Sequence, residues 1–118
     1  MNIYAFDVDE TLEVSGGPVL INDLWHLRKD GHILGICGNF QVGTHRIHRW
    51  DMLFSFVGQM EMPKERFLMQ VKTYLPPAED YIMVGNDDRF FGASKDYQAA
   101  QAAGWRFLRE SEFASGLR

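Results

Sequence analysis

A short apolar run that leads into two carboxylates limits the folds open to this chain. Ile3-Tyr4-Ala5-Phe6 is followed at once by Asp7-Val8-Asp9-Glu10-Thr11. A continuous apolar run of this length is typical of a strand buried on both faces. In an extended chain Asp7 and Asp9 project to the same side, so their carboxylates repel unless a cation or a proton lies between them. The run therefore predicts a buried strand that ends in an acidic site.

Four further apolar runs alternate with helical patterns. We expect strands at Ile3–Phe6, Ile33–Cys37, Ser55–Gln59, Tyr81–Gly85 and Trp105–Leu108. We expect helices at Val19–Lys29, at Gln41–Phe54, from Lys64 through Leu75, from Asp96, and at Glu110–Ala114. Strands that alternate with helices predict a parallel sheet with helices on both faces. The predicted fold is α/β, a single Rossmann-like three-layer domain over residues 1–118 with a central parallel five-stranded sheet, and 118 residues suffice for one core.

The paired acids indicate phosphoryl-transfer chemistry. Mg²⁺ prefers oxygen ligands and pairs well with substrate phosphates, so it is the natural cation between Asp7 and Asp9. An ionised Asp7 can attack phosphorus to form an aspartyl-phosphate, while Asp9 protonates the leaving oxygen and later activates water. The alternative interpretation is an acidic strand end that only caps a helix or turn.

The pattern of an apolar run, Asp-x-Asp-x-Thr and Leu resembles the first motif of the haloacid dehalogenase-like (HAD) phosphatases. This resemblance implies that Asp7 is the nucleophile, Asp9 the general acid/base and Thr11 the residue that braces the pair. It also implies a magnesium site that includes both acids.

Two later segments resemble the same family. The run Tyr81–Gly85 leads into Asn86-Asp87-Asp88, similar to the paired-acid form of the family's fourth motif. The carboxyl ends of strands are where open α/β sheets bind ligands. We therefore expect Asp87 to ligate the metal with support from Asp88, the alternative being a solvated turn. Residues 96–104 resemble the helix that follows this motif in the family.

The chain departs from the family pattern at two positions. Where the second motif ends in Ser or Thr, this chain has Gly38 followed by Asn39. Backbone N–H groups or the Asn39 amide could hold the phosphate instead. If only the hydroxyl is missing, Gly38→Ser is expected to raise the rate. The second departure is Asn86, which occupies the place of a metal carboxylate.

The family also requires a lysine beside the nucleophile, and Lys64 and Lys72 are the candidates. Pro63 suits the first helical position, which places Lys64 in the opening turn, near the strand ends. Lys72 lies two turns further on and suits a solvated face. We expect Lys64 to serve, and the alternative is an ordinary surface lysine.

The predicted domain leaves no room for a cap. The protein thus resembles the capless HAD members, small magnesium-dependent phosphatases and phosphatase domains that act on polynucleotide ends. An open site either accepts a large phosphorylated substrate or is closed by a neighbouring subunit, so a homo-oligomer is a possible state. Phe90 and Phe91 are either a subunit contact or a hydrophobic wall of the site.

Net charge and cysteine content indicate which partners and which cellular compartment the sequence favours. A net charge of −4 and a pI near 5.5 argue against general nucleic-acid binding, although a polynucleotide end stays open as a substrate. The basic stretch His45–Trp50 is read as a solvated helix face, or as a contact to a polyanion. The single Cys37 and the absence of a signal peptide or long apolar run predict a cytoplasmic protein without a membrane segment.

Together these features predict a magnesium-dependent phosphomonoester hydrolase. The alternative is a catalytically weak HAD-like module that binds a phosphorylated ligand or a protein partner. Intact Asp7, Asp9 and Thr11 favour the enzyme, whereas Gly38 and Asn86 favour the binding module.

Overall fold

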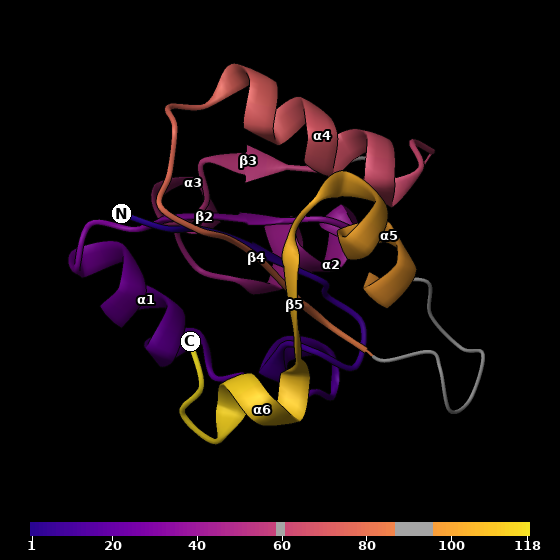
Figure 1. Ribbon diagram of the computed structural model, residues 1–118. Helices are drawn as coiled ribbons and strands as arrows, with labels where there is room; N and C mark the ends of the chain where they lie inside the picture. Colours follow the sequence, from indigo (N-terminus) through magenta and orange to yellow (C-terminus); the bar gives the residue numbers. More distant parts are fainter. Residues whose placement is uncertain (59–60, 87–95) are drawn as a thin grey trace.

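The computed structural model describes residues 1–58, 61–86 and 96–118 (Figure 1). The strands in this part of the chain are β1 (Ile3–Phe6), β2 (Ile33–Ile36), β3 (Phe56–Val57), β4 (Tyr81–Gly85) and β5 (Arg106–Arg109). The helices are the 3₁₀ turn η1 (Glu13–Ser15) and α1 (Ile21–Lys29), α2 (Phe40–Arg46), α3 (Trp50–Leu53), α4 (Lys64–Tyr74), α5 (Asp96–Ala103) and α6 (Glu110–Ala114). All strand pairings are parallel and the order is β3-β2-β1-β4-β5. The predicted α/β fold with a five-stranded parallel sheet is thus confirmed.

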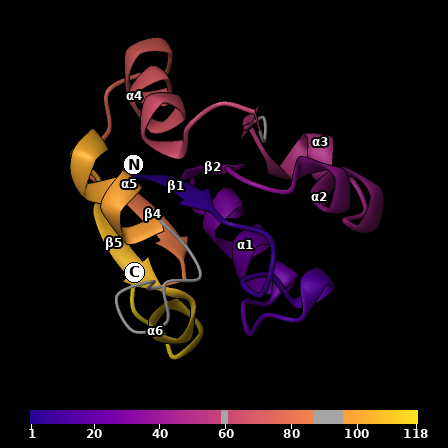
Figure 2. The ribbon, with the colours of Figure 1, turned by 90° about the vertical axis from the view of Figure 1, so that its right-hand side faces the viewer.

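The sheet is covered on both faces, which produces three layers (Figures 1 and 2). Helices α4 and α5 cover one face and pack on Ile3, Ala5 and Met83. On the other face α1, α3 and α6 pack on Tyr4 and Phe6. Alternate residues of β1 thus enter opposite cores, as the period of a strand requires. Because every residue of β1 is buried, the central strand reads as one uninterrupted apolar run.

The prediction of one continuous helix at Gln41–Phe54 is wrong. The chain forms α2 and α3 with a break between them, at which Ile47 is extended and Arg49 adopts a left-handed conformation with φ +58°. The break lets Ile47, Leu53 and Phe54 all reach the core. Packing of these apolar side chains therefore overrides the local preference for a continuous helix.

Other boundaries also differ from expectation, and β3 is limited to Phe56–Val57 rather than Ser55–Gln59. Helix α1 begins at Ile21 rather than at Val19, because Val19 forms a parallel bridge with Leu12. Strand β5 begins one residue later than expected, at Arg106.

The carboxyl ends of β1, β2 and β4 lie level with one another. Phe6, the last residue of β1, is in register with Ile36 of β2 and Val84 of β4. From β1 the chain proceeds to β2 and β3 on one side, whereas β4 and β5 lie on the other side. Such a reversal of strand order opens a crevice at the carboxyl edge of an α/β sheet. The residues that directly follow these three strands therefore lie close together at this edge of the sheet.

Candidate active site

Asp7 lies at the carboxyl edge of the sheet, directly after β1. Its backbone N–H donates to the carbonyl of Val84 at 2.9 Å, which continues the pairing of β1 with β4 by one residue. The side chain is almost fully buried. The sheet therefore fixes the carboxylate of Asp7 in a largely desolvated position.

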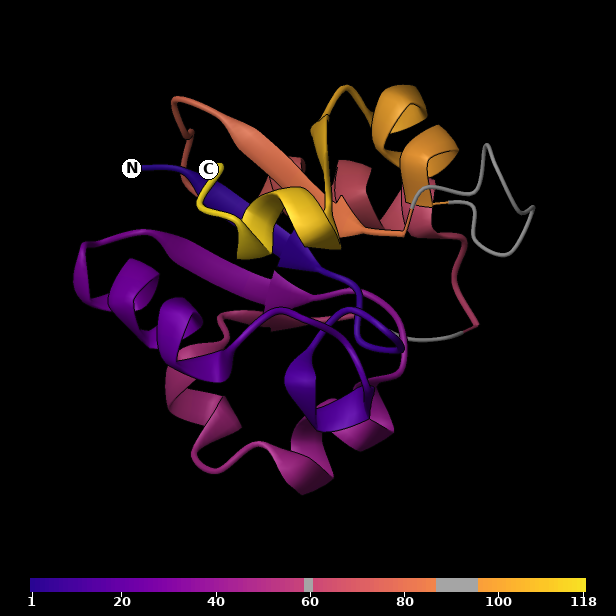
Figure 3. The same cartoon turned by 90° about the horizontal axis from the view of Figure 1, so that it is seen from below.

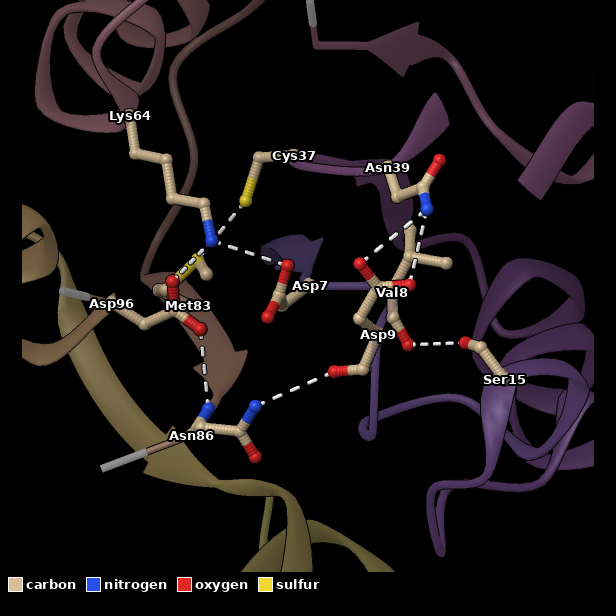
Figure 4. A network of polar contacts seen from close by, with 10 residues as sticks. All are labelled: Asp7, Val8, Asp9, Ser15, Cys37, Asn39, Lys64, Met83, Asn86 and Asp96. Carbon is tan, nitrogen blue, oxygen red and sulfur yellow. Dashed lines mark hydrogen bonds and ion pairs between the residues drawn. The ribbon is translucent and has the colours of Figure 1, made fainter. Parts of the chain in front are cut away.

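Lys64 reaches Asp7 from the first turn of α4. Its Nζ donates to Oδ1 of Asp7 at 3.1 Å and to Oδ1 of Asp96 (Figure 4). Lys72 does not reach the site. Its Nζ donates to the carbonyl of Gly104 at 2.9 Å and lies 4.8 Å above the ring of Tyr81. Of the two lysines considered from the sequence, Lys64 is the one that contacts the acid.

Asp96 is a residue of this site that sequence reasoning did not select. It is fully buried at the start of α5, and its Oδ2 accepts the backbone N–H of Asn86 at 3.2 Å. A Cβ atom at Gly85 would overlap this carboxylate, so glycine there is what allows the close approach. Asp96 thus connects the end of β4 to Lys64. Aspartate is common at the start of a helix as a cap, so the sequence carried no separate signal for this contact.

The buried Asp7 carboxylate lies beside Asp96 and Lys64, and its surroundings affect its protonation. Burial raises the pKa of Asp7 from its ordinary value of 3.8 to about 7; the charge of Asp96 adds to the rise and Lys64 opposes it. Burial alone would lower the pKa of Lys64, but Asp7 and Asp96 outweigh it and raise that pKa. Lys64 is therefore a permanent cation, and Asp7 is ionised only in part at neutral pH.

Asp9 lies nearby and is exposed. The amide Nδ2 of Asn39 donates to both of its carboxylate oxygens, at 3.1 Å and 3.4 Å. The Oδ1 of Asn39 accepts the N–H of Val42 at 3.4 Å, so the same residue caps α2. Asn86 donates from Nδ2 to the carbonyl of Asp9 at 3.4 Å. Asn39 and Asn86 thus both donate to Asp9 (Figure 4).

Gly38 passes close to Asp7, and the backbone of Thr11 braces the loop after β1. A Cβ at Gly38 would lie 2.5 Å from Oδ1 of Asp7, and φ there is +141°, so the backbone passes too close to Asp7 for a side chain. Thr11 is fully buried, but its hydroxyl has no hydrogen-bond partner among the described residues. Its backbone braces the loop instead, donating to Val8 and accepting from Val19.

Cys37 follows β2 and is buried against the same cluster. Burial raises the pKa of its thiol well above the ordinary value, with Lys64 opposing the rise. The Sγ contacts Sδ of Met83 at 3.3 Å. A neutral buried thiol acts as a small apolar group, as expected from the sequence.

Asp7 and Asp9 would offer a magnesium ion carboxylate oxygens, the kind of ligand that this ion prefers. Among residues 1–58, 61–86 and 96–118 no group of three or more His, Cys, Asp or Glu side chains is placed to hold a metal. The predicted ligands Asp87 and Asp88 lie outside the described residues, as do Phe90 and Phe91.

Comparisons of the chain with protein-family models, with curated proteins and with solved structures found no match. The resemblance to HAD phosphatases therefore stays a prediction based on sequence motifs. In the described part of the chain no helix is both long and apolar enough to cross a membrane.

Proposed function

We propose that the protein is a magnesium-dependent phosphomonoester hydrolase in which Asp7 is the nucleophile. The observation that carries the proposal is the contact of Lys64 with the buried Asp7 carboxylate at the carboxyl end of β1, with Asp9 exposed two residues further on. A fixed carboxylate next to a permanent cation and a solvent-exposed acid/base is a set of groups suited to phosphoryl transfer.

The reaction follows from the positions of these groups. A carboxylate oxygen of Asp7 attacks phosphorus and displaces the ester oxygen, which takes a proton from Asp9. Asp9 then removes a proton from water, the water oxygen attacks phosphorus, and the bond to Asp7 breaks to release phosphate. Asp9 is suited to both proton transfers because it is exposed to the solvent that supplies the water.

Lys64 and the cation have separate tasks. Lys64 orients Asp7 and favours its ionised form, in which the carboxylate is nucleophilic. Mg²⁺ held by Asp7 and Asp9, with Asp87 and Asp88 as the further ligands proposed from the sequence, would offset charge on the phosphoryl oxygens. The lone thiol of Cys37 is consistent with the cytoplasmic location that we propose.

A second candidate function is a binding module for a phosphorylated ligand or protein partner. Gly38 supplies no hydroxyl for a phosphoryl group, and the amide of Asn39 is already paired with Asp9. A site with these two losses could hold a phosphate without transferring it.

A phosphatase assay separates the two functions. We expect the purified protein to hydrolyse p-nitrophenyl phosphate with magnesium and to lose turnover when a chelator is added. Asp7→Asn should abolish turnover while circular dichroism shows an intact fold, because it removes the nucleophile and keeps the shape. Turnover that survives the chelator contradicts the role of magnesium, and turnover that survives in Asp7→Asn contradicts the nucleophile. An inactive wild-type protein that binds phosphate supports the binding module.

A further inference from the structure

A second concave surface lies away from the candidate active site. It is a groove of about 460 Å³ between η1, α1 and the connection from α2 to α3, elements that lie together on one face of the sheet (Figure 3). Its lining residues are Glu13, Val14, Ile21, Trp25, Arg46, Ile47, His48 and Arg49. None of them belongs to the cluster around Asp7. The volume is in the range of sites for small ligands.

The groove combines a flat apolar wall with basic side chains. Trp25 is only partly buried, and Ile21, Val14 and Ile47 extend the apolar surface beside it. Arg46 and Arg49 are exposed, and they stand out in a chain whose net charge is −4. Guanidinium groups bind phosphate oxygens through paired hydrogen bonds, and an indole ring offers a face to another aromatic ring.

Glu13, the acidic residue in the lining, already accepts a hydrogen bond from the backbone. Oε2 of Glu13 accepts the backbone N–H of Ile21 at 2.5 Å, so this carboxylate lies at the amino-terminal end of α1. The dipole of α1 and the bond to Ile21 offset its charge. With two arginines and one glutamate, the lining has more cationic than anionic side chains.

The side chain of Arg46 is held by a backbone carbonyl, and Arg49 has an unusual backbone conformation. Arg46 donates from Nη1 to the carbonyl of Val14 at 3.2 Å, which fixes its guanidinium at the edge of the groove. Arg49 has a left-handed backbone with φ +58° and ψ 37°, an uncommon conformation for a residue other than glycine, asparagine or aspartate. Strained backbone of this kind is often found at binding sites.

From these contacts we propose that the groove binds a small aromatic phosphate of the nucleoside monophosphate class. The aromatic ring lies against Trp25, and the phosphate is bound by Arg46 and Arg49. The basic stretch at residues 45–50, which the candidate active site does not use, thereby has a ligand. This binding does not depend on catalysis at Asp7.

Binding of adenosine 5′-monophosphate to the full chain tests the proposal. The titration is done with a chelator present so that the nucleotide is not hydrolysed, and it is followed by calorimetry and by the ¹⁵N-labelled indole signals. Loss of one signal in Trp25→Phe assigns Trp25. We expect the nucleotide to shift that signal, and to bind more tightly than either adenosine or inorganic phosphate.

A charge variant and a matched control identify the phosphate contact. Arg49→Asn removes the guanidinium while asparagine tolerates the left-handed backbone, so the fold is retained. We expect it to weaken binding by at least about tenfold. Arg66→Gln changes the net charge equally on the exposed part of α4 and should bind as the wild type does. Asp7→Asn should also leave this binding unchanged.

Each of five results would overturn the proposal. Four of them are an unshifted Trp25 signal, equal affinity in Arg49→Asn, adenosine binding as tight as that of the monophosphate, and loss of binding in Asp7→Asn. The fifth is tighter binding of a short single-stranded oligonucleotide than of the mononucleotide, because the occupant is then a nucleic acid.

Discussion

Lys64 and Asp7 are 57 positions apart in the chain, yet Nζ of the lysine lies 3.1 Å from Oδ1 of the aspartate. The contact joins the first turn of α4 to the end of β1, and Asp96 completes it from the start of α5. Three elements thus supply one charged cluster, in which Lys64 contacts two buried acids. Removal of Lys64 is costly, because both acids lose a cation that they contact.

Replacement of Lys64 by methionine tests that cost. We expect Lys64→Met to lower the free energy of unfolding by about 3 to 5 kcal/mol at pH 8, measured by urea denaturation, because Asp7 and Asp96 lose their shared counter-charge. Lys72→Met is the control, since Lys72 is on the same helix and contacts a carbonyl oxygen and the Tyr81 ring rather than a buried acid among the described residues. It should cost less than about 1.5 kcal/mol. Equal losses of unfolding free energy in the two variants would show that the contacts of Lys64 stabilise the fold no more than those of Lys72.

The pH dependence of stability provides a test of Asp7 itself. Because the pKa of Asp7 is raised from 3.8 to about 7, the folded state binds this proton more tightly than the unfolded state does. The contribution of Asp7 to stability is therefore most favourable below pH 3.8 and falls as pH rises toward 7, by at most about 4 kcal/mol.

Asp7→Asn removes this titration. In the absence of magnesium, the variant should be more stable than the wild type at pH 8, and the difference should shrink as pH falls to 5. Thermal unfolding at a series of pH values gives the comparison. A difference that is constant with pH would mean that the pKa of Asp7 is not raised.

The sheet and the position of Asp7 could be predicted because both depend on local pattern. An uninterrupted apolar run such as Ile3–Phe6 fits few environments other than a doubly covered strand, and an acid after it must lie at the sheet edge. Lys64 was predictable from Pro63, which marks the helix start that faces this edge.

Asp96 and the pairing of Asn39 with Asp9 could not be predicted in the same way. Asp96 is 32 positions from Lys64 and 89 from Asp7, and its burial depends on how α5 packs against α4. The break at Arg49 is similar, since it is set by the burial of Leu53 and Phe54. In each case a long-range contact, rather than a local preference, decides the conformation.

The structure reverses the outcome expected for Gly38→Ser. The added Cβ meets Oδ1 of Asp7, so the variant should displace the nucleophile and lower the rate of any phosphatase activity. Gly116→Ser is the control, because Gly116 also has a positive φ, +114°, but a Cβ there would meet no atom within 4 Å. Both variants carry backbone strain, and only Gly38→Ser should lose activity. A faster Gly38→Ser enzyme would show that the backbone shifts to admit the hydroxyl.

The last prediction concerns the amide that positions Asp9. Asn39→Ser keeps an oxygen that can accept the N–H of Val42, so α2 stays capped, but it loses the two hydrogen bonds to the Asp9 carboxylate. We expect kcat for p-nitrophenyl phosphate to fall by about ten- to one-hundredfold, because the general acid/base is less well positioned, with little change in the melting temperature. Asn39→Asp keeps the cap as well and places a second carboxylate against Asp9, so its loss of kcat should be larger. If both variants retain wild-type kcat, Asn39 does not position Asp9 for proton transfer.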